Sequence, residues 1–171
     1  MRPAGAGIAG IDAVEAACER TGTGRLRLTW RIRGALGRLR LPEPRTGADR
    51  EDGLWWHTCL EAFIVPEPER AGYVEVNLAP SLAWQTYAFD DYRAGQRIAS
   101  AHPLVDLAAR RERDALQVTA VLRLEAAAGA RVALAAVLED VDGALSYWAL
   151  AHAPGRPDFH WRGGFVLQLP D

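Results

Sequence analysis

The sequence predicts an all-β protein, an antiparallel β-sandwich of jelly-roll or immunoglobulin-like type. Apolar and polar residues alternate with a period of two over most of the chain, which is typical of strands with one buried face. Gly, Pro and Asp-Gly turn signals separate eight or more short segments of this kind. Many short strands divided by turns favour a sandwich or a barrel. We predict one β-sandwich domain over residues 25–171, preceded by an N-terminal segment at 1–24.

The elements follow in chain order from this periodicity. Residues 11–20 carry apolar side chains at weakly helical spacing, which predicts a short N-terminal helix. The stretch RLRLTWRIR at 25–33 alternates cleanly, with its leucines, Trp30 and Ile32 on the inner face. Residues 104–113 fit either a helical turn or an irregular strand. Further strands are expected at 54–65, 73–79, 84–89, 116–124, 131–139, 145–151 and 164–169.

The composition excludes several classes of function. The 171 residues have a formal net charge of −2, so we expect neither nucleic-acid nor membrane binding. Every basic residue is Arg, which excludes lysine chemistry. Cys18 and Cys59 lack zinc-type spacing. The N-terminal residues are too polar for a secretory signal and no segment approaches the length of a membrane span, so we expect a cytoplasmic protein.

Two of the predicted strands, 54–65 and 73–79, place polar side chains on one face of the sheet. Their connection is short, so they should pair as an antiparallel hairpin in which residues of matching parity share a face. Glu61 is then expected near Glu75 or Asn77. The shared face is predicted to hold two carboxyl groups, an amide, an imidazole and a ring, from Trp55, His57, Glu61, Glu75 and Asn77.

The first of these strands begins with the unusual stretch LWWHTCLEAF. Strict alternation there places Trp56 on the inner face and His57 on the polar face, at the end near Ala79 and Ser81. A face that only contacts solvent would be expected to carry polar side chains with fewer aromatic rings. The stretch therefore raises the question of whether this face binds a ligand.

Several chemistries could use such a face. Carboxyl and amide groups suit sugar hydroxyls, while a Trp ring packs against the apolar side of a pyranose. Two close carboxylates could instead share Ca²⁺ with a backbone carbonyl, or serve as the acid and base of a glycosidase. The remaining alternative is a solvated outer face on which a Glu–Asn hydrogen bond sets the strand register.

Two loops add further ligand-binding candidates. FDDYRAGQR contributes Tyr92 and Arg93, and predicts either an Asp–Arg pair that holds the loop or a ligand clamp. Two histidines and an aspartate around a Pro/Gly turn resemble a metal set, but their spacing matches no template, so we predict neither a metal nor a cofactor. The candidates in this second loop are His152, Asp158, His160 and Trp161.

Three stretches resemble a known family. LWWHTCLEAFI, YVEVNLAPSLAWQTYAFDDYR and VLEDVDGALSYWALAHAPGRPDFHWRGGFVLQL are similar, in this order, to the DOMON-like domains of bacterial proteins. These domains are relatives of the family-nine carbohydrate-binding modules and of cytochrome and dopamine-hydroxylase-type DOMON domains. The resemblance covers about residues 25–170. It implies an antiparallel β-sandwich that holds a sugar or a haem, and it does not imply an enzyme.

The residues present separate these two ligands. Haem-binding members typically use a Met and a His as axial ligands, and Met1 is the only methionine. Bis-histidine ligation would need two of His57, His102, His152 and His160. Sugar binding needs rings and hydroxyl partners, which six Trp and the acidic face supply. We predict a non-catalytic module for a saccharide-like small molecule. The alternatives are a haem-binding electron-transfer domain and a sugar-acting enzyme that uses Glu61 and Glu75.

Overall fold

The computed structural model describes residues 1–99 and 103–170 of the chain. Within these residues the protein is all-β, and its only helical segments are the short 3₁₀ turns η1 (Leu36–Arg38), η2 (Leu54–Trp56) and η3 (Arg162–Gly164). The strands are β1 (Arg2–Pro3), β2 (Ile11–Gly22), β3 (Arg25–Gly34), β4 (Cys59–Val65), β5 (Tyr73–Leu78), β6 (Trp84–Phe89), β7 (Arg97–Ile98), β8 (Leu104–Arg111), β9 (Ala115–Arg123), β10 (Arg131–Glu139), β11 (Leu145–Ala149) and β12 (Leu167–Gln168).

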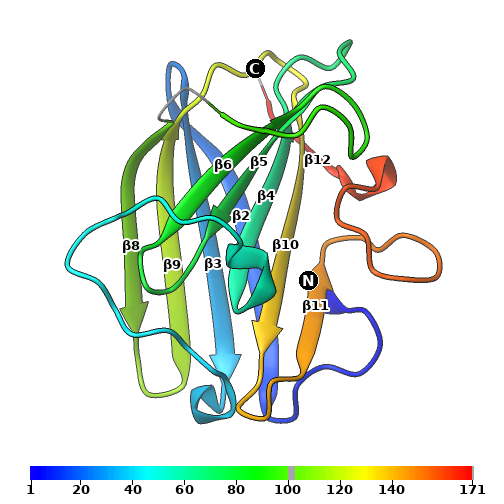
Figure 1. Cartoon of the computed structure of the whole chain (residues 1–171). Helices are drawn as coiled ribbons and strands as arrows, with labels where there is room; N and C mark the ends of the chain where they lie inside the picture. Colours follow the sequence, from blue (N-terminus) through cyan, green and yellow to red (C-terminus); the bar gives the residue numbers. More distant parts are fainter. Residues whose placement is uncertain (100–102, 171) are drawn as a thin grey trace.

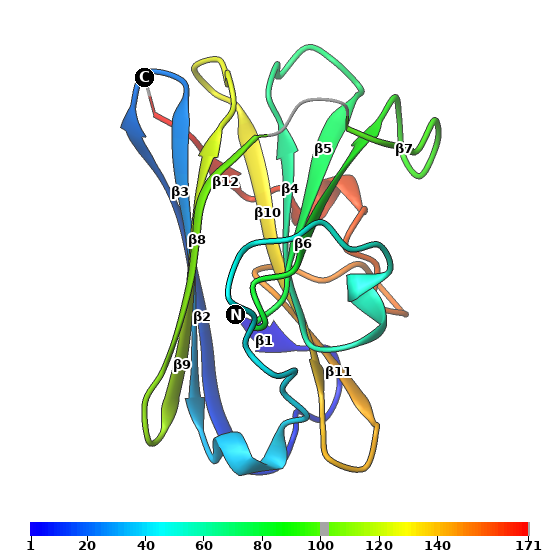
Figure 2. The same ribbon diagram turned by 60° about the vertical axis from the view of Figure 1, so that its left-hand side comes forward.

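The strands form two antiparallel sheets. The larger sheet has the order β1-β11-β10-β4-β5-β6-β7, with β12 also paired to β10, and the smaller sheet has the order β2-β3-β9-β8. Figure 2 shows the two sheets as separate layers that face each other. The structure therefore confirms the predicted all-β class and its antiparallel pairing.

The core lies between the two sheets. Leu28 and Trp30 of β3 and Leu60 of β4 are fully buried in one apolar cluster that both sheets contribute to. The indole N–H of Trp30 donates a hydrogen bond of 3.1 Å to the carbonyl oxygen of Ala135 on β10, which joins the layers directly. Burial of the inner faces of both sheets, at about 25 cal/mol for each Å² of apolar surface, stabilises this arrangement, and β4 is buried on its outer face as well.

The predicted N-terminal helix is wrong, because residues 11–22 form the edge strand β2. This strand pairs with β3 along its length, with Val14 opposite Ile32 and Cys18 opposite Leu28. Its inner positions include the small residues Ala16 and Cys18, and a register shift between Ile11 and Ala13 interrupts the period, so its alternation is weak in the sequence. Cross-strand pairing with the strongly alternating β3 overrides the local helical spacing.

Three other segments test the expected strands. The strand expected at 164–169 is reduced to β12 (Leu167–Gln168), because Arg162–Gly164 form the 3₁₀ turn η3. Residues 104–111 form β8, which decides between the two expected structures for that segment in favour of a strand. The strand expected at 54–65 begins only at Cys59, because Gly53 has a φ of 76° and opens the 3₁₀ turn η2. The strict alternation does not extend into this turn, and Trp56, expected on the inner face, is 66% exposed.

Loops cover the face of the larger sheet that points away from the smaller one. Figure 1 shows η2 in front of the sheet, and the segment after β11 (orange to red) returning beside β10 to reach β12. Beneath them lies a second apolar cluster that includes Phe63, Tyr73 and Phe89. Among the described residues, no helix is long and apolar enough to cross a membrane.

Candidate functional site

A cleft of about 360 Å³ opens on this outer face of the larger sheet. Glu61 of β4 and Glu75 of β5 form its floor. Its aromatic lining consists of Trp55, Trp56, Phe89, Tyr147 and Phe159. Its other polar groups are Arg93, Gln96, Asp158 and His160, and Val137, Leu145 and Pro157 complete the lining.

The hairpin of β4 and β5 positions the floor. Glu61 lies opposite Asn77, and Phe63 lies opposite Glu75, so the two glutamates are diagonal neighbours on one face. The expectation that Glu61 lies near Glu75 or Asn77 is confirmed. All three polar side chains are buried, with exposed fractions of 4% for Glu61, 5% for Glu75 and 0% for Asn77.

These buried side chains keep unused hydrogen-bonding capacity. Asn77 donates from Nδ2 to Oε1 of Glu75 at 2.8 Å. Oε1 of Glu61, Oε2 of Glu75 and Oδ1 of Asn77 have no hydrogen-bond partner within the described residues. Buried polar atoms normally find partners, since leaving one unpaired costs about 1–3 kcal/mol. The floor of the cleft therefore has acceptors available to a ligand.

Burial also changes the protonation of the floor. It raises the pKa of Glu75 to about 7, although the hydrogen bond from Asn77 and the charge of Arg93 act in the opposite direction. Burial raises the pKa of Glu61 well above its ordinary value, and the nearby charge of Glu75 raises it further. At pH 7 Glu75 is therefore about half protonated, and Glu61 keeps its proton to a higher pH than an exposed glutamate would.

His160 reaches the floor from the loop after β11. Burial and then the charge of Arg93 lower its pKa to about 4, so the imidazole is neutral at pH 7. The Tyr73 hydroxyl lies 2.7 Å from Nδ1 of His160 and accepts a hydrogen bond of 3.3 Å from the backbone N–H of Arg93. The hydroxyl proton is therefore directed to Nδ1. The imidazole proton is assigned to Nε2, which lies 3.8 Å from Oε2 of Glu75.

Asp158 joins two loops that wall the cleft. Its carboxylate accepts hydrogen bonds from the Tyr92 hydroxyl at 2.5 Å, from Nη2 of Arg93 at 2.8 Å and from the backbone N–H of His160 at 3.0 Å. Arg93 itself has a φ of 50°, which is uncommon for a residue with a side chain. An Asp–Arg pair does hold the loop after β6, and the aspartate comes from the distant second loop.

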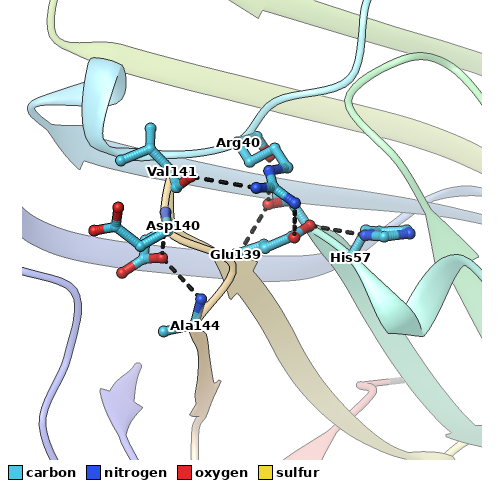
Figure 3. Close-up of polar contacts among 8 residues, drawn as sticks. Arg40, His57, Glu139, Asp140, Val141 and Ala144 are labelled. Carbon is cyan, nitrogen blue, oxygen red and sulfur yellow. Dashed lines mark hydrogen bonds and ion pairs between the residues drawn. The ribbon is translucent and has the colours of Figure 1, made fainter.

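His57 lies outside the lining of the cleft. Its Nδ1 is 2.8 Å from Oε2 of the buried Glu139, and Arg40 donates to the other oxygen of this carboxylate at 2.8 Å (Figure 3). The imidazole is on the β10 side of β4, and not beside Ala79 and Ser81, because η2 turns the chain before the strand begins. His57 is exposed, with a side-chain exposed fraction of 69%.

Four other predicted residues also lie outside the lining, and one of them, Asn77, is buried beside Glu75. Tyr92 donates a hydrogen bond from its hydroxyl to Asp158, which lines the cleft. His152 holds the backbone carbonyl of Arg2 with Nε2 at 2.8 Å. Trp161 precedes η3, and its ring lies against Gly163. Of the sequence-predicted residues, the cleft thus brings together Trp55, Glu61, Glu75, Arg93, Asp158 and His160, with Asn77 beneath them.

Sequence reasoning missed several residues of the lining. Tyr147 lies opposite Val137 on neighbouring strands, so the alternation of β11 could have placed it on this face. Phe159 and Gln96 come from loops, where no periodicity indicates direction. No group of three or more His, Cys, Asp or Glu that could hold a metal occurs in residues 1–99 and 103–170. His102 lies outside the described residues.

Comparisons with known proteins identify solved structures of similar fold. Neither a family model nor a curated protein matches the chain. A proposed carbohydrate-binding protein from Bacteroides uniformis has a TM-score of 0.64 and 13% identity, over 91% of this chain and 78% of that one. A family-nine carbohydrate-binding module from Caldicellulosiruptor kristjanssonii has TM-scores of 0.46 in complex with glucose and 0.43 with cellotriose. Both comparisons with the module give 12% identity and cover 83% of this chain, with 76% and 75% of that one. At 13% identity, the likeness to the Bacteroides protein establishes a shared fold.

Proposed function

We propose that the protein is a non-catalytic binding module whose cleft takes a small saccharide or a similar polar metabolite. The observation that carries this proposal is the pair of buried glutamates on the cleft floor, Glu61 and Glu75, each with an oxygen that lacks a protein partner. A ligand with several hydroxyl groups would supply the missing hydrogen bonds. Without such a ligand these buried groups are a net cost to folding.

The walls of the cleft support the same class of ligand. Trp55 and Tyr147 present rings beside the polar floor, and rings of this kind pack against the C–H face of a sugar. The volume of about 360 Å³ is near the small end of typical ligand sites, which span about 300–1,000 Å³. The cleft therefore suits a short ligand better than a long polymer. The shared fold with the Bacteroides protein and the resemblance to DOMON-like domains add support.

Calorimetric titration with a panel of mono- and disaccharides tests the proposal, with Trp fluorescence as a second signal. We expect Trp55→Ala to weaken binding about two- to tenfold, since one aromatic contact contributes about 0.5–1.5 kcal/mol beyond the area that it buries. Trp161→Phe is the matched control, because Trp161 lies outside the lining. A folded protein that binds no member of the panel would disprove the proposal.

A second candidate function is glycoside hydrolysis. It is favoured by the pKa of about 7 at Glu75, which suits a general acid at neutral pH, and by the neighbouring Glu61. A retaining enzyme also needs an ionised nucleophile, and the raised pKa of Glu61 opposes that role. Release of reducing ends from oligosaccharides, lost in Glu75→Gln, would establish hydrolysis in place of simple binding.

A further inference from the structure

Acidic groups outnumber basic groups around the cleft. Glu61, Glu75 and Asp158 contribute carboxyl groups, whereas Arg93 contributes the one guanidinium of the described lining. His160 adds no charge at pH 7, because burial lowers its pKa to about 4. Full ionisation of the three acids would leave an excess of negative charge in a partly dry site.

The guanidinium of Arg93 pairs with a residue of the cleft wall and not with the floor. Arg93 forms its ion pair with Asp158 at 2.8 Å, and within the described residues it donates no hydrogen bond to either floor glutamate. The guanidinium of Arg162 lies over the ring of Tyr73, 5.3 Å from its centroid, and the buried thiol and phenols near the floor are neutral at pH 7. Burial raises the pKa of Cys59 and of Tyr87, and it raises the pKa of Tyr73 to about 12.

The unpaired floor atoms have a common chemistry. When the two glutamates are ionised, Oε1 of Glu61 and Oε2 of Glu75 are acceptors, as is Oδ1 of the neighbouring Asn77, and none of the three has a hydrogen-bond partner among the described residues. An ammonium group is the matching donor, since it carries three N–H bonds and no acceptor. Its charge would also offset that of the floor, and the faces of Trp55 and Tyr147 attract cations.

We propose that the cleft selects ligands that carry an ammonium group, such as an amino sugar, over the neutral sugar of the same shape. This inference rests on the proposed function and names the ligand class for the same site. A neutral sugar would leave the two carboxyl groups to act as uncharged acids. A cationic ligand instead pairs with them in their ionised form.

Calorimetric titration at pH 7 with glucosamine, glucose and N-acetylglucosamine tests this selectivity. We expect glucosamine to bind at least about tenfold more tightly than glucose, since hydrogen bonds between charged partners are roughly twice as strong as neutral ones. N-acetylglucosamine, which keeps the ring and loses the charge, should lose the advantage. Equal or tighter binding of glucose would overturn the inference and leave the proposed function standing. Binding of none of the three sugars or of the wider panel would overturn both.

Proton exchange gives a second readout that needs no variant. Titrations at pH 7 in buffers of different ionisation enthalpy report the protons released or taken up. Glucosamine should release protons, because the ammonium group favours the ionised form of Glu75, whose pKa is about 7 in the free protein. Uptake of protons, or no exchange, would contradict an ammonium group at the floor.

Variants locate the selectivity. Glu61→Gln and Glu75→Gln keep the size of the side chain and remove the charge, so each should reduce the preference for glucosamine over glucose at least threefold. Glu69→Gln, on the exposed loop between β4 and β5, is the matched control. Circular dichroism verifies the fold of each variant. A preference that persists when both floor glutamates are replaced would show that other groups recognise the amine.

Discussion

Asn77 donates a hydrogen bond of 2.8 Å to Oε1 of Glu75, which lies two residues earlier on the same face of β5. Neighbouring positions of that parity on a strand point the same way, so the amide lies beneath the carboxyl group. This hydrogen bond engages one oxygen of the Glu75 carboxyl group. The other oxygen, Oε2, faces His160 and lies 3.8 Å from its Nε2. This pairing therefore sets which oxygen a ligand can use.

We expect Asn77→Ala to raise the pKa of Glu75 above its value of about 7. The amide N–H stabilises the ionised carboxylate, and its removal leaves burial less opposed. Carboxyl ¹³C chemical shifts followed through a pH titration measure the change. Thr23→Ala, at an exposed turn, is the control. An unchanged or lowered pKa would show that the hydrogen bond does not form in solution.

We expect the free energy of unfolding to fall as pH rises from 6.5 to 8. A carboxyl group with a raised pKa binds more protons in the folded than in the unfolded state. The contribution of Glu75 and Glu61 to the stability of the fold is therefore lost as the pH rises through this range. Each group contributes at most about 1.4 kcal/mol per pH unit.

His160 opposes this slope only at lower pH. Its lowered pKa makes stability rise with pH between about 4 and 6.5, and above that range it adds nothing. Urea denaturation at a series of pH values measures the trend. Replacement of both floor glutamates by Gln should flatten it, and a wild-type protein that gains stability from pH 6.5 to 8 would refute the assignment.

We expect Asp158→Asn to loosen both loops of the cleft. The substitution removes the charge that pairs with Arg93 and weakens the bond from the Tyr92 hydroxyl. Amide hydrogen exchange should increase at 90–96 and 151–161, and sugar affinity should fall about tenfold. Asp142→Asn, on the exposed turn between β10 and β11, is the control. Unchanged exchange in both loops would argue against this coupling.

We expect the protein to purify colourless and to bind no haem specifically. His57, His152 and His160 each have one ring nitrogen engaged by a protein partner, and Met1 is the only methionine. Haem titration followed at the Soret band is the measurement. A sharp stoichiometric shift that His57→Ala or His152→Ala abolishes would make electron transfer the leading function.

Local patterns were enough to predict the floor of the cleft. Strict alternation in β4 and β5, together with a short connection, determines which residues face the same way and which lie opposite one another. Glu61, Glu75 and Asn77 follow from that alone. The same approach failed at 11–20, where small residues hide the alternation and the pairing with β3 decides the structure.

The sequence by itself therefore determined the all-β class, which follows from a period of two over most of the chain, and the acidic pair, which follows from the same period within one hairpin. Only the tertiary structure decided that these carboxyl groups lie in a cleft. Arg93 and Asp158, which close its wall, are 65 residues apart, and both lie in loops that no period describes. The φ of 76° at Gly53 likewise turned Trp56 outward and carried His57 to Glu139. Such placements depend on contacts between loops that are distant in the sequence, and no local pattern specifies these contacts.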